Sequence, residues 1–143
     1  MTSGVLTEST IVLHGRAGTR DEAISEAGRL LVAAGMVEPS YVDAMLAREA
    51  SVSTHMGSGL AIPHGTNDAK ATVRRTGLSF VRHREPIDWD GRPTEFVIGI
   101  AAAGEDHLPL LSRVAEVFSA PEQVQRLRDA TSPAEVLAVL EAD

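Results

Sequence analysis

Apolar residues along the chain form short continuous runs and longer stripes at helical spacing, and the two patterns predict different elements. The runs at 10–13, 60–62 and 76–81 predict strands. A fourth run, TEFVIGIAA at 94–102, has a nearly continuous apolar centre, which is typical of a strand with both sheet faces covered.

Two helices are expected before the middle of the chain. The first begins at the capping box TRDE, 19–22, whose side chains satisfy the free N–H groups of a helix start, and it stops at Gly35. The second opens with Pro39 in its first turn. The residues expected on the buried faces are Ile24, Ala27 and Leu31 in the first helix and Val42, Met45 and Leu46 in the second.

Three more helices are expected after the last strand. One starts near Asp106, and two short ones begin near the capping-box sequences SAPE at 119–122 and SPAE at 132–135. The stripe expected on the first of them is His107, Leu111, Val114, Ala115 and Phe118.

Because helices interleave with strands, the pattern predicts an α/β domain in which helices flank a sheet. The irregular spacing favours a mixed sheet over a regular parallel one. Neither a repeat nor a linker interrupts residues 1–143, a length that suits one core, so we expect a single-domain layered sandwich.

Composition narrows the classes of function. The formal net charge of −7 argues against DNA or RNA as a partner, because phosphate backbones are bound by clustered Lys and Arg. That charge is either ordinary solubility charge or an attraction for a basic protein surface. The absence of cysteine excludes disulfides and cysteine nucleophiles. No apolar run approaches the ~20 residues that span a bilayer, and residues 1–10 lack a secretory signal pattern. We expect a cytoplasmic protein that does not insert into a membrane.

His64 lies in the most constrained stretch of the chain, MGSGLAIPHG at 56–65. Pro63 fixes its own φ and favours an extended residue before it, and the neighbouring glycines permit positive φ and close approach. The strand at 60–62 is therefore expected to carry the imidazole to a sheet edge, in a shallow opening lined by glycine. The alternative is a histidine that ends a strand and bonds a carbonyl, and spacing alone does not decide between the two.

His107 and Arg48 are candidates for the same opening. If Asp106 caps the third helix, His107 occupies its first turn, where free N–H groups and a partial positive charge suit an anion. Each also has a plain alternative: His107 as a partly buried core residue, and Arg48 as a cation at the C-terminal end of its helix. Together with glycine-exposed amides, these side chains would suit a phosphoryl group passing through imidazole. Neutral histidine is a nucleophile near pH 7, and phosphoryl transfer needs mainly positioning and charge neutralisation.

The other histidines are weaker candidates. His14 and His83 stand in apparent turns and are interpreted as surface residues. His55 lies close before His64 in sequence and could approach it. No carboxylate or third histidine follows at the spacing of familiar zinc motifs, so we expect neither a metal nor another cofactor.

A resemblance to a known family is carried by the run GSGLAIPHGTNDAK. This run resembles the phosphorylation-site motif of the enzyme IIA components of the bacterial phosphoenolpyruvate-dependent sugar phosphotransferase system, in the fructose–mannitol family. Two further segments, TRDEAISEAGRLLVAAGMVEPSYVDAMLAREA and FVIGIAAAGEDHLPLLSRVAEVF, are similar to the helical hairpin and the second-histidine region of that family. Details such as GTNDAK and MVEPSYVDAMLARE are closer to its mannitol branch. The resemblance implies the family's α/β sandwich with a mixed sheet.

The same resemblance implies a phosphocarrier with phosphotransferase activity. The phosphorylated carrier protein HPr would donate a phosphoryl group to Nε2 of His64, and an enzyme IIB, with a cysteine acceptor in the mannitol type, would receive it for sugar uptake. The family's roles place the assisting histidine at His107 and the charge-stabilising arginine at Arg48. The residues expected to bind the phosphoryl group are Gly57, Ser58, Gly59 and Gly65. The acidic balance of the chain would then attract HPr.

Two positions depart from the family pattern, because Ser58 stands where asparagine is common and His55 where an aromatic residue is frequent. Ser58 can still donate a hydrogen bond, but it reaches less far. No IIB or membrane segment accompanies the domain, so the IIB partner is expected to be a separate polypeptide. Three rival interpretations are a regulatory relative of the nitrogen type, a non-catalytic interaction module, and a metal-dependent hydrolase. The intact histidines and arginine count against the module, and the hydrolase lacks metal ligands.

Overall fold

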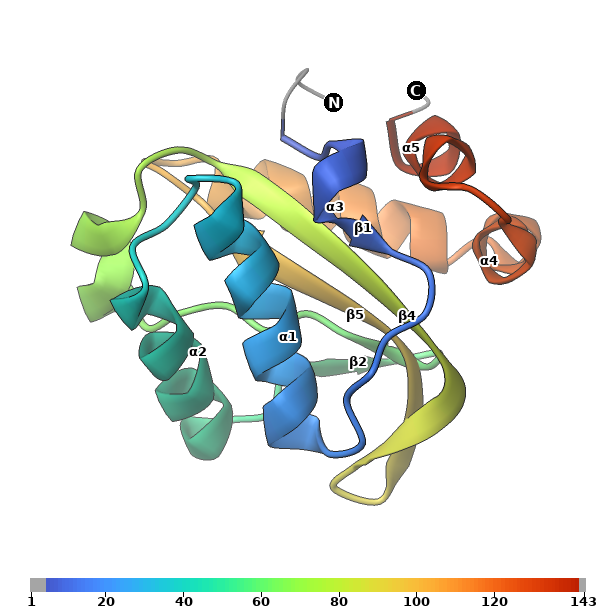
Figure 1. The fold of residues 1–143 in the computed structure, drawn as a ribbon, viewed down its shortest axis with the longest axis horizontal. Coiled ribbons are helices and arrows are strands. Elements are labelled where there is room, and N and C mark those ends of the chain that lie inside the picture. The colour runs from blue at the N-terminus through green and yellow to red at the C-terminus, as the bar shows by residue number, and fades with distance from the viewer. Residues whose placement is uncertain (1–4, 142–143) are drawn as a thin grey trace.

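The computed structural model describes residues 5–141, which are built around one mixed sheet (Figure 1). The strands lie in the order β1-β4-β5-β3-β2. Their bounds are β1 (Ile11–Val12), β2 (His55–Gly57), β3 (Leu60–Ala61), β4 (Gly77–Trp89) and β5 (Arg92–Ala101). The pairs β1–β4 and β3–β5 are parallel, whereas β2–β3 and β4–β5 are antiparallel. The mixed sheet expected from the sequence is confirmed.

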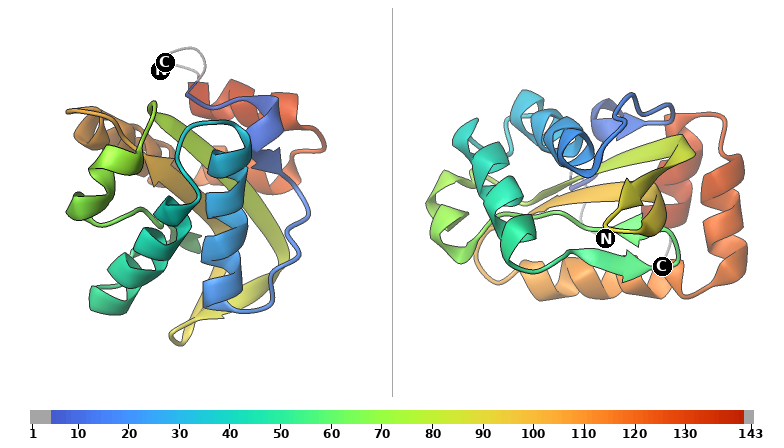
Figure 2. Two further views of the ribbon diagram at one scale, coloured as in Figure 1. Left: turned by 60° about the vertical axis from the view of Figure 1, so that its left-hand side comes forward. Right: turned by 90° about the horizontal axis from the view of Figure 1, so that it is seen from below.

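Helices cover both faces of the sheet, as Figures 1 and 2 show. Helices α1 and α2 lie on one face of the sheet and α3 lies on the other. Helices α4 and α5 lie beside the C-terminal end of α3. The helices are η1 (Glu8–Thr10), α1 (Arg20–Ala33), α2 (Ser40–Ser51), η2 (Asn67–Thr72), α3 (His107–Phe118), α4 (Pro121–Asp129) and α5 (Pro133–Glu141). Each face of the sheet has its own apolar cluster, so the layered α/β fold is also confirmed. Within residues 5–141, no helix has the length and apolar character that a membrane crossing requires.

The start of α1 uses the expected capping residues in a modified way. Thr19 is the N-cap, and its hydroxyl accepts from the N–H of Glu22 at 3.2 Å. The Glu22 carboxylate does not return to Thr19 but accepts from the N–H of Gly18 at 2.9 Å. Gly35 follows the helix with a φ of 74°, the left-handed conformation that glycine adopts without strain.

The last two helices begin differently from each other. In α5 the Ser132 side chain accepts from the N–H of Glu135 at 3.4 Å, as the capping-box sequence predicts. In α4 the N-cap is Ala120, with no side-chain cap, and the hydroxyl of Ser119 instead donates to the carbonyl of Glu116. The capping prediction for α4 is therefore wrong, although its start near Pro121 is right.

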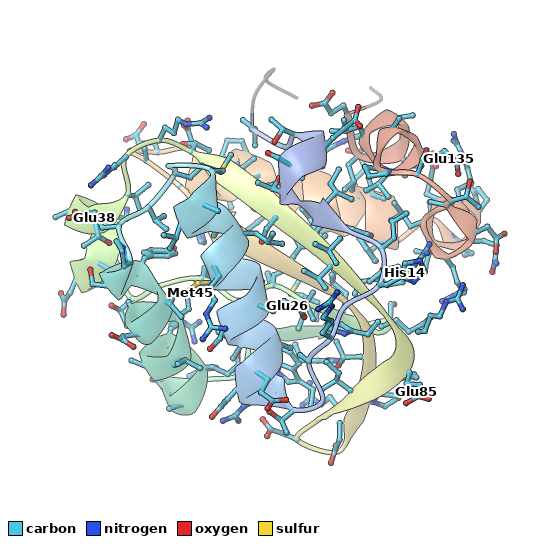
Figure 3. All side chains as sticks on the ribbon, in the orientation of Figure 1. His14, Glu26, Glu38, Met45, Glu85 and Glu135 are labelled. Carbon is cyan, nitrogen blue, oxygen red and sulfur yellow. The ribbon has the colours of Figure 1, made fainter. Side chains whose placement is uncertain are left out.

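The buried face of α2 differs from the expected one. Tyr41, Met45 and Glu49 are buried, whereas Val42 and Leu46 are only half-buried. Figure 3 shows Met45 pointing from α2 toward α1, which it packs against. The inward stripe thus contains a phenol and a carboxylate that apolar spacing does not reveal.

The buried face of α3 also differs in part. The buried side chains are Leu110, Val114, Val117 and Phe118. Ala115, expected on this face, is exposed, and Leu111 and His107 are half-buried. The helix is rotated so that His107, in its first turn, reaches the edge of the core rather than its interior.

β4 is much longer than the strand expected at 76–81, because it pairs with β5 over most of its length. The turn between them is Asp90–Gly91, with φ values of 54° and 91°. Positive φ at both central residues is the geometry of the tightest hairpin turns, for which Asp-Gly is a favoured sequence. The pairing register shifts between Arg82 and Ile87, which is where Pro86 would interrupt a regular ladder.

The length of β4 changes the position of His83. This residue lies inside the strand and is 2% exposed, so its interpretation as a surface residue was wrong. His14, by contrast, is exposed as expected.

Candidate active site

His64 is held just beyond the end of β3 by hydrogen bonds on the residues before it. The N–H of Ile62 donates to the carbonyl of Thr54 at 3.1 Å, and the carbonyl of Pro63 accepts from the N–H of Ile100 at 3.0 Å. His64 itself forms an isolated parallel bridge with Ile100. The imidazole therefore projects from a fixed backbone beside the end of β5.

The hydrogen bond of the ring selects its reactive nitrogen. Nδ1 of His64 lies 2.8 Å from the carbonyl oxygen of Ile62. Because a carbonyl only accepts, Nδ1 carries the proton and Nε2 keeps its lone pair. Burial lowers the pKa of His64, and the nearby His107 and Arg48 lower it further. The ring is therefore a neutral imidazole with a nucleophilic Nε2 at pH 7.

A cleft of about 410 Å³ opens at this ring. Its walls are formed by Tyr41, Arg48, Ser51, His64, Gly65, Thr66, Lys70, Val73, Ala102 and His107. The His107 ring stands edge-on to that of His64, with centroids 5.1 Å apart and an interplanar angle of 69°. Burial lowers the pKa of His107, and the charges of Lys70 and Arg48 add to this effect. Cationic side chains from α2 and η2 thus face one histidine pair.

Arg48 lies both at the end of its helix and at the cleft, the two positions considered from the sequence. One guanidinium nitrogen donates to the carbonyl of Val52 at 2.6 Å, which caps the C-terminal end of α2. The same side chain lines the cleft. The helix end therefore fixes the guanidinium group of a cation that lines the cleft beside His64.

Tyr41 fixes the other side of the histidine. Its hydroxyl accepts from the N–H of Gly65 at 2.8 Å and donates to the carbonyl of Ile100 at 2.8 Å. A Cβ at position 65 would lie 2.6 Å from the Tyr41 ring, so this close approach requires glycine. Gly65 lines the cleft as expected, but its N–H is already bound to Tyr41.

A family model described as "Phosphoenolpyruvate-dependent sugar phosphotransferase system, EIIA 2" matches residues 4–143. The chain belongs to this family. It is 47% identical over 140 residues to the mannitol-specific phosphotransferase enzyme IIA component of Halalkalibacterium halodurans, covering 98% of this chain and 97% of that protein.

Solved structures of the same family have the same fold. The IIA chain in a complex of enzyme IIA mannitol and phosphorylated enzyme IIB mannitol from Escherichia coli matches with a TM-score of 0.89 and 36% identity, over 96% of this chain and 97% of that one. The nitrogen regulatory protein IIA-Ntr from Neisseria meningitidis matches with a TM-score of 0.79 and 31% identity, over 95% and 96%.

The structure separates the candidate residues of this EIIA chain into two groups. His64, His107, Arg48 and Gly65 surround one cleft. Gly57 instead ends β2, and Ser58 and Gly59 form the turn to β3, with φ values of 87°, 54° and 73° for the three residues, and none of them lines the cleft. Their positive φ serves the turn at the opposite end of β3 from His64. We therefore leave these three residues out of the proposed site.

His55 does not join the cleft either. It lies in β2, and its Nδ1 accepts from the N–H of Gly57 at 3.1 Å. Burial lowers its pKa, as does the neighbouring Arg92. No group of three metal-ligating side chains was found among residues 5–141.

Two side chains that line the cleft of this EIIA chain were not among the residues predicted from the sequence. Tyr41 sits one position before the stripe expected on α2, and Lys70 follows the histidine motif within TNDAK. The signal for Lys70 was a cation shortly after the candidate histidine His64. Tyr41 carried no such signal, because its role depends on contact with residues 65 and 100.

Proposed function

We propose that this chain is a phosphocarrier: His64 accepts a phosphoryl group from phosphorylated HPr and passes it to an enzyme IIB for mannitol uptake. The observation that carries the proposal is the unprotonated Nε2 of His64 at a cleft walled by Arg48, Lys70 and His107. A neutral nucleophile among cations is what the transfer of an anionic group requires.

The transfer uses the side chains as follows. The Nε2 lone pair attacks phosphorus, an N–P bond forms, and the donor atom keeps the electron pair of the bond that breaks. Arg48 and Lys70 line the cleft beside His64 and neutralise the charge of the phosphoryl oxygens, and the N–H of the His107 ring donates a hydrogen bond to them. Onward transfer is the reverse displacement, in which His64 is the leaving group.

The mannitol assignment is supported by the relatives and by the Escherichia coli complex, in which enzyme IIA mannitol is paired with phosphorylated enzyme IIB mannitol. The regulatory alternative has a weaker basis, since the identity to the nitrogen regulatory protein is 31%, against 47% to the mannitol-specific relative. We propose the cytoplasm as the site of action, where phosphoenolpyruvate supplies the phosphoryl group.

Phosphorylation in vitro tests the proposal. The chain is incubated with phosphoenolpyruvate, enzyme I and HPr, and its intact mass is measured. We expect one added phosphate that is labile in acid and stable in base, absent from His64→Ala and present in the control His14→Ala. An unmodified wild-type chain, or a phosphate retained in His64→Ala, would contradict it.

Addition of purified IIB domains distinguishes the two roles. We expect the phosphate to move to a mannitol-type IIB and not to a fructose-type IIB. Retention of the phosphate with every IIB, together with phosphate-dependent binding of a regulatory protein, would favour the nitrogen-type role. If the net charge of −7 steers HPr to this chain, the rate of uptake should fall as salt rises.

A further inference from the structure

Glu49 is a buried carboxylate that the proposed transfer has not used. It is 4% exposed and faces inward from the last turn of α2. Its oxygens accept from the N–H of Thr54 at 3.2 and 3.0 Å, from the Thr54 hydroxyl, and from Nε1–H of Trp89 at 3.0 Å. Burying a carboxylate is costly even when donors compensate, so an apolar side chain would be the simpler choice for packing alone.

Hydrogen bonds lead from Glu49 to the nucleophile. Glu49 holds Thr54 by both its N–H and its hydroxyl, and the carbonyl of Thr54 accepts from the N–H of Ile62 at 3.1 Å. The carbonyl of Ile62 in turn accepts from Nδ1–H of His64 at 2.8 Å. Glu49 thus fixes Thr54, Thr54 fixes Ile62, and Ile62 orients the imidazole of His64.

The chemistry of the transfer gives the charge of Glu49 a purpose. When Nε2 of His64 bonds to phosphorus and Nδ1 keeps its proton, the ring gains one positive charge. The donor loses the phosphoryl group and keeps the electron pair of the broken bond. Across a poorly solvated region, a fixed anion attracts such a charge more strongly than it would across bulk water, and this attraction offsets part of the desolvation cost.

The electrostatics of His64 agree with this direction. The carboxylate of Glu49 raises the pKa of His64, against the lowering by burial, His107 and Arg48. Lys70 faces His107 from η2, and Glu49 also acts on His55 of β2, beside Arg92 of β5. Glu49 is therefore a buried anion that opposes the effect of Arg48 and His107 on the His64 ring.

We propose that Glu49 is a positioning residue for phosphoryl transfer. It fixes the His64 ring through Thr54 and Ile62, and its buried charge stabilises the positive charge that the ring gains. This inference rests on the proposed function of His64 as phosphoryl acceptor.

Glu49→Gln keeps the size of the side chain and removes its charge. Trp89→Phe is the matched control, since it removes one donor to the carboxylate but keeps the charge and the link to Thr54.

Three quantities are measured: the His64 ring pKa by NMR without phosphate, the rate of uptake from phosphorylated HPr, and the phosphoryl equilibrium between the two proteins. For Glu49→Gln we expect a lower ring pKa and an equilibrium shifted toward HPr by about tenfold, which corresponds to about one pKa unit. In Trp89→Phe, the uptake rate and the phosphoryl equilibrium should stay within about twofold of the wild-type values. This should hold even if Trp89→Phe loses as much thermal stability as Glu49→Gln.

Several outcomes decide the inference. Glu49→Asp, which keeps the charge on a shorter stem, should recover part of the ring pKa. An unchanged pKa and equilibrium in Glu49→Gln would overturn the inference. If Glu49→Gln does not fold, Thr54→Val removes the hydroxyl that Glu49 holds and keeps the Thr54 N–H bond to Glu49. A wild-type transfer rate together with a wild-type His64 ring pKa in Thr54→Val would overturn the positioning through Thr54, whereas a slower rate that Thr54→Ser restores would support it.

A failure of the proposed function itself would look different. The wild-type chain would then take up no phosphate, while the ring pKa, measured without phosphate, would still report whether Glu49 acts on His64.

Discussion

The regions around His64 and His83 contain the same side chain in opposite settings. Burial lowers the pKa of both rings. His64 borders an open cleft with Arg48 and His107, whereas His83 lies under α1 with its Nε2 3.8 Å from the carboxylate of Glu26. Figure 3 shows Glu26 on α1, facing the segment that precedes this helix.

The His83 region is closed by the backbone. The chain passes so near that a Cβ at Gly15 would lie 2.3 Å from the His83 ring. His83 borders a second cleft with Arg82 and Arg128, but its side chain is only 2% exposed. The charged group nearest to its ring is the carboxylate of Glu26, which has the wrong sign for a phosphoryl group. A lowered pKa therefore does not by itself indicate a nucleophile. Access and the sign of the surrounding charge decide which of the two histidines can react.

The largest expected difference between these regions is in the two alanine variants. His64→Ala should lose all phosphate uptake and keep its stability, because the ring borders a cleft. His83→Ala should still be phosphorylated but lose about 2 kcal/mol of unfolding free energy, because a buried ring leaves a cavity. Intact mass and urea denaturation measure the two effects. The comparison fails if His83→Ala has lost its uptake while still folded, or has the urea midpoint of the wild type.

The next effect separates acceptance from onward transfer in the cleft. A phosphoryl group on His64 is an anion beside His107, and it favours the protonated, donating form of that ring. We therefore expect His107→Ala to slow transfer to IIB by about tenfold or more and to slow uptake from HPr less. Single-turnover kinetics with each partner measure both steps. Normal transfer to IIB would remove His107 from the mechanism.

The sequence predicted the parts of the site that local signals define. Pro63 and Gly65 mark the bend that presents His64, and Asp106 marks the start of the helix that carries His107. These signals act within a few residues, so a single sequence contains them. Closeness in sequence was also the reason for including Gly57, Ser58 and Gly59 in the predicted site. These residues lie at the start of β3, whereas His64 follows its other end.

The remainder depends on contacts between distant segments. β4 continues through the polar residues after 81 because β5 pairs with it across the turn Asp90–Gly91. Asp-Gly is a hairpin signal, but the strand prediction used only the apolar runs. That error also placed His83 on the surface. The buried face of α2 is rotated because Tyr41 bonds Ile100 and Glu49 bonds Trp89, both far along the chain. Apolar periodicity carries no information on such polar contacts.

A smaller effect is expected for Tyr41→Phe, which tests the backbone that supports His64. The change leaves the N–H of Gly65 and the carbonyl of Ile100 without their present partner. Unsatisfied buried groups cost about 1–3 kcal/mol, so the urea midpoint should fall measurably. Uptake from HPr should slow by less than tenfold, because the nucleophile and the cations remain. A variant with wild-type stability and wild-type kinetics would show that the hydroxyl bridge is dispensable.

The smallest effect is the pH dependence of stability in the closed region. Because burial lowers the pKa of His83, the unfolded chain binds a proton there more readily than the folded chain. Its contribution to stability is complete above the unfolded pKa of about 6.5 and is lost as the pH falls toward the lower folded pKa. Glu26 opposes this shift, and His55, His64 and His107 contribute in the same direction as His83. The wild-type free energy of unfolding should therefore fall between pH 7 and pH 5, and His83→Gln should reduce this slope by at most about 1.4 kcal/mol per pH unit. Denaturant titrations at the two pH values measure the slope, and an equal slope in both proteins would mean that His83 is protonated alike in the folded and unfolded chains.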